Sequence, residues 1–336
     1  MNAWKQKVLC YGRYNPCSSI RLLGAHFRLM GSFTEILECR QVRCTNEAYF
    51  IDEAMKHETA PLISIIVAVF NGKATLQQCI DSVTQQTYPN KELIIIDGGS
   101  QDGTVELLEE NSKKFSYWIS ESDGGLYNAW NKGLAQAKGE WICFLGADDY
   151  FWDAHVLTRM SEQLETLTPN IRVAYGQIMV LNRKGESLYP LGESWESIKQ
   201  RFKKCMCLPH PGAMHRRSLF EQHGTFDESF RIAGDYELLL RELKNADAMF
   251  VPGLVLVGMR QGGVSSNPAA SLLMLHEARR AQRMHGQRCP SSPWVLSMLR
   301  VYLRLLLWRM LGECLARRTL DLGRRMQGQP AYWTKT

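Results

Sequence analysis

The stretch EWICFLGADDY, residues 140–150, joins a core strand to two adjacent acids. Its first half is rich in aromatic and aliphatic side chains, as expected for a buried strand. A Gly-Ala step ends the strand, and Asp148 and Asp149 follow directly. Adjacent like charges repel each other, and no apolar run follows that would cover them. We therefore infer a functional reason for this acid pair at the end of a core strand.

Strands and helices alternate upstream of the acid pair. LISIIVAVFN (62–71) and KELIIIDGGS (91–100) are continuous β-branched runs, typical of strands covered on both faces. SYWIS (116–120) predicts a shorter strand, and helices are expected over 74–86, 102–114 and 128–137. This alternation, with short Gly-containing turns, predicts an α/β fold with a mostly parallel central sheet flanked by helices.

Acids close two of the predicted strands. Asp97 ends the second strand, and Asp148 and Asp149 follow the fourth. Ligands bind beyond the carboxyl ends of the strands in such sheets, so these acids can share one crevice. The pair could hold Mg²⁺ or Mn²⁺, which prefer carboxylate oxygens, and a bound cation would remove the repulsion. The alternative interpretation is two solvated turn acids.

Charge is unevenly distributed along the 336 residues. The formal net charge is +6, but nine basic residues against two acidic ones follow Gly286, so this tail carries +7. Within it, residues 294–311 (WVLSMLRVYLRLLLWRML) are apolar almost all round and interrupted by arginines. The uncharged runs are too short to span a bilayer, and a helix of this kind can lie in the headgroup region of an anionic leaflet. A helix packed on the domain or in a dimer is the alternative. Nucleic acid is disfavoured, because the basic residues alternate with leucines.

Cysteine usage favours a reducing compartment. Cys79 and Cys143 lie in apolar periodic stretches, where a free thiol is a small core residue. Cys205 and Cys207 are too closely spaced for the usual zinc knuckle. No apolar segment with a cleavage site opens the chain, so we expect no secretory signal and a cytoplasmic location.

The quoted motifs resemble those of family 2 glycosyltransferases of GT-A fold. The matching stretches are SIIVAVFNG, IIIDGGSQDGT, SESDGGLYNAWNKGLAQAKGEWICFLGADD and FRIAGDYELLLREL. The resemblance covers about residues 62–266 and is strongest to transferases that build bacterial exopolysaccharide, such as colanic acid, or O-antigen units. It implies a GT-A domain over 61–268, with a nucleotide-sugar half (61–153) and an acceptor half (154–268). Outside it remain an N-terminal extension, 1–60, expected to be poorly ordered, and a basic amphipathic helical region, 269–336.

The resemblance implies roles for individual residues. Asp235 matches the general base that takes a proton from the acceptor hydroxyl. Asp149 matches the acid that binds the metal, Asp148 matches the acid that contacts the ribose, and Asp97 matches the acid that contacts the base of the nucleotide. Further nucleotide-sugar contacts are implied for Val69, Asn71, Asp123 and Arg260, and His210 is a candidate acceptor contact.

Three of these residues also have structural interpretations. Asp235 could merely begin the helix YELLLREL. His210 could be a turn residue between prolines, and Arg260 could belong to a hairpin loop, RQGGVSS.

The implied reaction is an inverting transfer from a nucleotide-diphospho-sugar to a hydroxyl. A divalent cation, Mg²⁺ or Mn²⁺, would stabilise the leaving diphosphate as a Lewis acid. One base and direct displacement predict inversion at the anomeric carbon. We expect addition of one hexosyl or deoxyhexosyl unit to an undecaprenyl-diphosphate-linked acceptor, because no Gln-x-x-Arg-Trp element or set of spanning helices is present. The enzyme would then lie on the inner face of the cell membrane.

Two other classes compete with this interpretation. A non-catalytic nucleotide-sugar-binding scaffold of a polysaccharide assembly would keep the fold without transfer. A nucleotidyltransferase shares the sheet, but it should carry a Gly-rich, Arg/Lys-bearing first loop, which VAVFNGKATL does not match well.

Overall fold

The computed structural model describes residues 60–182, 184–261 and 268–326. The chain divides after Thr59, and the compact unit that begins at Ala60 contains all of these residues. Residues 1–59 of the predicted N-terminal extension, 1–60, and the Gly-Gly of RQGGVSS lie outside them.

The first half of this unit is a parallel α/β layer. Four strands pair in the order β3-β2-β1-β4, all parallel. Their bounds are β1 (Ile63–Val69), β2 (Lys91–Asp97), β3 (Tyr117–Ser120) and β4 (Trp141–Gly146). The intervening helices are α3 (Lys73–Thr84), α4 (Thr104–Glu110), η1 (Ser112–Lys114) and α5 (Leu126–Gln136). Each strand and helix predicted from the alternating pattern is present here, with ends shifted by a few residues.

The second half extends the same sheet as β4-β8-β6-β9-β5, with β7 also paired to β6. Its elements are β5 (Tyr150–Phe151), α6 (Val156–Leu164), β6 (Val173–Leu181), β7 (Ser187–Leu191), α7 (Trp195–Phe202), β8 (Met214–Arg216), α8 (Arg217–His223), α9 (Gly234–Leu243) and β9 (Met249–Arg260). β6 and β9 are parallel, whereas β4–β8, β6–β8, β6–β7 and β5–β9 are antiparallel. The predicted α/β fold is confirmed, and the sheet is mixed beyond β4.

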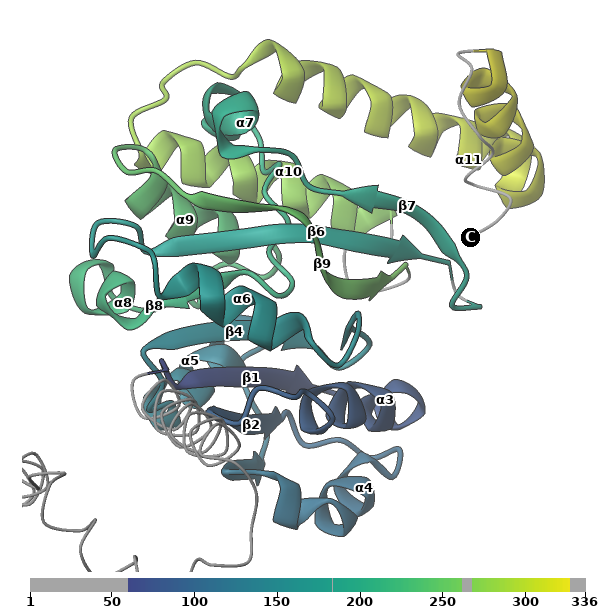
Figure 1. The fold of residues 1–336 in the computed structure, drawn as a ribbon. Helices are drawn as coiled ribbons and strands as arrows, with labels where there is room; N and C mark the ends of the chain where they lie inside the picture. Colours follow the sequence, from purple (N-terminus) through teal and green to yellow (C-terminus); the bar gives the residue numbers. More distant parts are fainter. Residues whose placement is uncertain (1–59, 183, 262–267, 327–336) are drawn as a thin grey trace, which may run out of the picture. The chain divides into compact units, whose positions relative to one another are not determined.

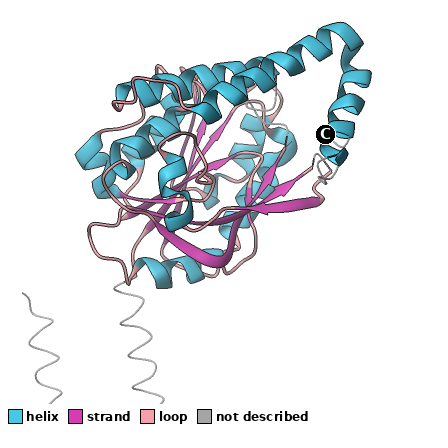
Figure 2. Cartoon of the chain, turned by 90° about the horizontal axis from the view of Figure 1, so that it is seen from above, coloured by secondary structure: helices cyan, strands magenta, loops and turns pink. Residues whose placement is uncertain are grey.

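Both faces of the sheet are buried, because apolar side chains occupy both alternations of the central strands. Ile66, Ile94 and Phe144 point into a core with α5, α7, α8 and α9. Ile65 and Ile95 point to the other side, into a core with α3, α4 and α6. Helices therefore lie on both sides of the strands (Figure 2).

Two helices follow the sheet, α10 (Pro268–Met284) and α11 (Ser292–Met326) (Figure 1). α10 packs beside α9, and α11 packs on α10 through Leu275, Met298 and Val301. α11 changes direction at Gly312, whose φ of 68° is a left-handed value that favours glycine. Of the helices within the described residues, none combines the length and apolarity needed to cross a bilayer.

Gly133 sets the distance between α5 and the sheet. A Cβ atom at this position would lie 2.4 Å from Ile66 Cγ2 in β1, far closer than two carbon atoms approach. The glycine lets α5 lie directly on β1 and β2. α5 carries Tyr127 and Trp130, so the packing of this one glycine fixes the place of both aromatic side chains.

We expect Gly133→Ala to lower the free energy of unfolding by about 1–3 kcal/mol, because the added methyl overpacks the core. The matched control is Gly323→Ala in α11, where an added Cβ meets no atom within 4 Å. Alanine is the better helix former by roughly 0.5–1 kcal/mol, so the control should be neutral or stabilising. Urea denaturation of both variants measures the difference. Equal stability of the two variants would contradict the close packing of α5.

Candidate active site

The carboxyl ends of β1, β2 and β4 lie at one level. In the strand register Val69 of β1 pairs with Asp97 of β2, and Ala68 pairs with Gly146 of β4. β1 is the central strand of the three, so Asp97 and the acid pair after β4 flank its end. Sheet order reverses at β1, and such switch points form the ligand crevice in open α/β sheets.

Asp97 is fully buried, and its carboxylate organises the loop that follows β2. Its Oδ2 accepts hydrogen bonds from the N–H groups of Gly99 (3.0 Å) and Ser100 (2.9 Å) and from Ser120 Oγ (2.6 Å). Its Oδ1 accepts a bond from Ser100 Oγ. With these bonds made, Asp97 has a supporting role in this structure, and its predicted contact with the nucleotide base stays a prediction.

Asn71 joins the loop after β1 to the loop after β2 through two hydrogen bonds. Its N–H donates to Ser100 Oγ (2.6 Å), and its Oδ1 accepts the N–H of Gln101 (2.9 Å). Asn71 has a φ of 50°, a left-handed conformation that asparagine tolerates better than most residues. The two loops therefore form one rigid rim beside Val69.

Asp123 lies over this rim, beside Gly98, the residue that follows Asp97. A Cβ atom at Gly98 would come within 2.9 Å of Asp123 Oδ2. The other oxygen, Oδ1, accepts the N–H of Gly125 (2.9 Å). Glycine at position 98 thus leaves room for an acid supplied from the loop after β3. This places Asp123, not Asp97, at the open side of the strand ends.

Asp148 and Asp149 converge above Gly146. A Cβ atom at Gly146 would lie 2.8 Å from Asp148 Oδ1 and 3.1 Å from Asp149 Oδ2, so glycine leaves a cradle between the carboxylates. Asp149 is 6% exposed, and burial raises its pKa to about 8, with the Asp148 charge adding to the rise. A cation in the cradle would compensate both effects.

This donor set fits a hard divalent ion that also binds a second molecule. No group of three or more His, Cys, Asp and Glu side chains that could hold a metal occurs in the described part of the chain. Two carboxylates are too few for a closed site, since Mg²⁺ and Mn²⁺ prefer six oxygen ligands. Phosphate oxygens and water would have to complete the coordination.

Arg260 reaches the acid pair through the β5–β9 pairing. Tyr150 pairs with Gly258 in antiparallel register, which brings the residues before Tyr150 beside the end of β9. The Arg260 charge partly opposes the rise in the pKa of Asp149. Its guanidinium donates to Gln78 of α3, while its Nε has no hydrogen-bond partner.

Asp235 lies in the first turn of α9 and is held by Tyr127 of α5. Tyr127 Oη donates to Asp235 Oδ1 (3.3 Å), and the N–H of Tyr236 donates to the same oxygen (2.8 Å). Burial raises the pKa of Asp235 to about 6, and the two hydrogen bonds oppose the rise. Such a carboxylate is ionised near neutral pH yet basic enough to accept a proton.

Tyr127 is the contact that sequence reasoning missed. It lies four residues after Asp123 in SESDGGLY, so one short segment touches both Gly98 and Asp235. Gly234 packs so closely on the Tyr127 ring that a Cβ atom there would lie 2.7 Å from it. The Gly-Asp pair at 234–235 was a usable signal, because a glycine in the first turn of a helix needs a packing reason.

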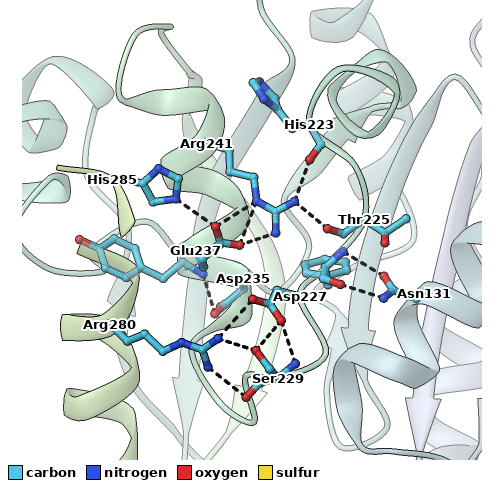
Figure 3. A network of polar contacts seen from close by, with 12 residues as sticks. Asn131, His223, Thr225, Asp227, Ser229, Asp235, Glu237, Arg241, Arg280 and His285 are labelled. Carbon is cyan, nitrogen blue, oxygen red and sulfur yellow. Dashed lines mark hydrogen bonds and ion pairs between the residues drawn. The ribbon is translucent and has the colours of Figure 1, made fainter. Parts of the chain in front are cut away.

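A polar network anchors α9 behind Asp235 (Figure 3). Glu237 is buried and binds Arg241 along the helix and His285 after α10 (3.0 Å). Arg241 also donates to the backbone carbonyls of His223 and Thr225, both at 2.8 Å. The network fixes α9 to its neighbours and leaves Asp235 on the other side of the turn.

His210 lies in an aromatic core. Its ring packs on Trp130 (centroids 5.2 Å apart), Phe144 (5.9 Å) and His215 (5.1 Å). The side chain is 5% exposed, and burial lowers its pKa to about 3, so the imidazole is neutral. The surroundings explain His210 better as a core residue than as an acceptor contact.

Comparison with known proteins identifies the family. The model of glycosyl transferase family 2 matches residues 64–224. A PGL/p-HBAD biosynthesis glycosyltransferase of Mycobacterium tuberculosis is 30% identical over 189 residues, which cover 55% of this chain and 71% of that relative. An uncharacterized glycosyltransferase of Rickettsia typhi is 29% identical over 231 residues, 67% of this chain and 72% of its own.

Solved structures share the fold at low identity. S. aureus TarS 1–349, in complex with UDP-GlcNAc, superposes with a TM-score of 0.52 at 19% identity. The match covers 64% of this chain and 65% of that chain, slightly under two thirds. The mannosyltransferase PcManGT of Pyrobaculum calidifontis, in complex with GDP-Man and Mn²⁺, gives 0.50 at 18% identity, over 78% and 76%. The matched family segment spans the strands that carry Asp97 and the acid pair, and the M. tuberculosis relative aligns over more than two thirds of its length. The chain therefore belongs to glycosyl transferase family 2 and has the GT-A fold.

Proposed function

We propose that the protein is an inverting glycosyltransferase that moves one sugar from a nucleotide-diphospho-sugar to a hydroxyl of a lipid-linked oligosaccharide. The main support is that two features lie at the same edge of the sheet, where β1, β2 and β4 end: the cradle between Asp148 and Asp149, and the rim under Asp123. Asp235 adds a base of suitable pKa, connected to that rim by the Asp123–Tyr127 segment. A hexosyl or deoxyhexosyl donor and a surface-polysaccharide product are part of the proposal.

The donor would lie along the ends of β1, β2 and β4. Val69 and Asn71 form the rim on which we place the nucleoside, with Asp123 and Asp148 as hydrogen-bond acceptors for base and ribose. Arg260 is suited to the diphosphate, because its guanidinium is close enough to influence Asp149 and a planar donor can bind phosphate through two N–H groups. The UDP-GlcNAc of TarS and the GDP-Man and Mn²⁺ of PcManGT support this class of donor and cofactor.

Asp149, with Asp148, would hold Mn²⁺ or Mg²⁺ in the cradle above Gly146. When bound, such an ion supplies Lewis-acid stabilisation of the charge on a departing diphosphate. Asp235 accepts the proton of the attacking hydroxyl, and Tyr127 keeps the carboxylate oriented through its hydrogen bond. A single base beside a direct displacement yields inversion at the anomeric carbon. Donor and acceptor held in one geometry contribute much of the remaining rate.

α11 suits a membrane-bound acceptor. Leu296, Leu299, Leu303, Leu306 and Met310 recur at helical spacing and are exposed, Met310 by 74%. The stripe that packs on α10, with Met298 and Val301, is displaced by two residues, which is about 200° around the helix. α11 therefore presents a second apolar face outward, which explains a sequence apolar almost all round.

We propose that this outward face lies in the headgroup region of an anionic membrane. The exposed arginines beside it, Arg300 and Arg309, and the +7 charge of the tail complement anionic lipid. Contact with the inner leaflet of the cell membrane would bring the active site to a polyprenyl-linked acceptor. A second copy of the chain is the other occupant that the test below distinguishes.

The donor experiment uses a panel of UDP-, GDP- and dTDP-sugars with MnCl₂, and it follows the release of nucleoside diphosphate with water as acceptor. We expect one donor to be turned over, and Asp149→Asn to reduce its turnover roughly 100-fold or more, because the cation loses its buried carboxylate. Glu110→Gln, an exposed acid on α4, is the control and should keep full turnover. A scaffold would turn over no donor, in wild type or variant.

Asp235→Asn should lower turnover of the selected donor by roughly 10²–10⁴-fold and leave donor binding intact. In the wild type the base must be deprotonated, so turnover should fall as pH drops through about 6 and level off above it. The pH–rate profile and isothermal titration with the donor measure both effects. Wild-type turnover in Asp235→Asn would exclude Asp235 as the base.

Leu303→Glu/Leu306→Glu should abolish co-sedimentation with vesicles of 70% phosphatidylcholine and 30% phosphatidylglycerol, since two charges enter the apolar stripe. Binding of the wild type should weaken in 0.5 M NaCl. Leu191→Glu, at an exposed leucine of β7, is the matched control and should bind like the wild type. Light scattering is run in parallel. A wild-type dimer that becomes a monomer in the double variant, without vesicle binding, would show that a second copy covers the face.

A further inference from the structure

The segment before α9 is bound by one carboxylate from another helix. The consecutive N–H groups of Arg231, Ile232 and Ala233 all donate to Glu277 of α10, at 2.8, 2.8 and 2.9 Å. Glu277 Oε1 accepts the first bond, and Oε2 accepts the other two. Glu277 is 7% exposed, so water competes little for these bonds.

This arrangement lies at the start of α9. Ala233 is the N-cap of the helix, so its N–H has no partner within α9, and the N–H groups of Arg231 and Ile232 belong to the backbone just before it. A carboxylate there gains charge-assisted hydrogen bonds and lies at the positive end of the helix dipole. Ala233 in turn accepts the N–H of Glu237 (3.1 Å), so the bound segment runs directly into the first turn of α9.

Asp235 follows the segment by two residues and is held from both sides. Tyr127 of α5 contacts its carboxylate, and Glu277 of α10 fixes the backbone that leads to it. α10 is itself tied down beside Glu277, because Gln282 donates to the carbonyl of Lys204 (2.7 Å) and Arg280 donates to Ser229 Oγ (2.6 Å). The Arg280 contact is visible in Figure 3.

We propose that Glu277 is a positioning residue for Asp235: by binding the N–H groups of residues 231–233 it holds the general base in the geometry that transfer requires. The proposal rests on the proposed function, in which Asp235 is the base. Glu277 does not touch substrate in it. A displacement of the base by about 1 Å can cost on the order of 100-fold in rate. A carboxylate that holds the backbone two residues before Asp235 therefore affects catalysis.

The groups that act on the Asp235 carboxylate come from two other helices. The hydroxyl of Tyr127 in α5 donates to it, and the charge of Glu277 in α10 acts on it. Glu237 of α9 is paired with Arg241 and with His285 on the other side of the turn. Glu277 is the acid among them that adds repulsion to ionised Asp235. Removing its charge should therefore move the acid limb of the pH–rate profile to lower pH.

The test variant is Glu277→Gln, which keeps the size of the side chain but replaces one acceptor oxygen with an NH₂ group, which donates and cannot accept. We expect kcat for the donor selected from the panel to fall about 10- to 100-fold, with KM for the donor changed by less than about threefold. The acid limb should shift to lower pH. In hydrogen exchange, amides of the peptide 226–237 should exchange faster than in the wild type.

Arg279→Ala is the matched control on the same helix. Arg279 also binds backbone carbonyls, those of Gln287 and Arg288, but none in the segment before Asp235. It should keep wild-type kcat and wild-type exchange in 226–237, even if the melting temperature falls as much as in Glu277→Gln.

Three results would overturn the proposal. Wild-type kcat and exchange in Glu277→Gln, alongside an inactive Asp235→Asn, would remove Glu277 and leave the base in place. An equal loss of kcat in Arg279→Ala would show that any disturbance of α10 suffices. Full turnover in Asp235→Asn would remove the proposed base, and the positioning role with it, even where exchange shows that Glu277 holds the segment.

Discussion

The active site depends on the common level at which β1, β2 and β4 end. Parallel register aligns Val69 with Asp97 and Ala68 with Gly146, so Asp97 and Gly146, which are 49 positions apart, reach one edge. A slip of one residue in this register would move Asp97 or Gly146 away from the shared level. The places of Asp97 and of the acid pair then follow from where β2 and β4 stop.

Glycines determine which acids stand open at that edge. Gly98 leaves space for Asp123, and Gly146 leaves space between Asp148 and Asp149. Asp97 also lies at the end of a strand, but its carboxylate is occupied by hydrogen bonds to the N–H groups of the loop after β2 and to Ser120. The same residue type therefore performs two tasks: hydrogen bonds within the protein occupy the Asp97 carboxylate, whereas the carboxylates of Asp148 and Asp149 lie around the space above Gly146.

Periodicity was sufficient to predict the first half of the fold, because β1, β2 and β4 are continuous apolar runs and Asp148–Asp149 interrupts one of them. It did not predict the antiparallel pairing of β8 or the short β5, since two- and three-residue strands have no measurable period. The burial of His210 was missed for a related reason: HPG suggests a turn, but Trp130 and Phe144 come from distant elements. The partners Tyr127 and Glu277 were missed because their hydrogen bonds join residues 108 and 44 to 46 positions apart, and a sequence pattern does not name so distant a partner.

α10 serves two neighbours with opposite faces. Leu275 contacts α11, and two residues further along Glu277 binds the segment before Asp235, the proposed base. Both residues lie outside the stretch that defines the family, 64–224. Grafting the C-terminal helices of one relative onto the sheet of another would therefore also exchange the contacts that hold the start of α9. Such a chimera would keep the strand ends that carry the acid pair, yet Asp235, the proposed base, would keep its alignment only if the incoming helix offered a carboxylate at the same turn.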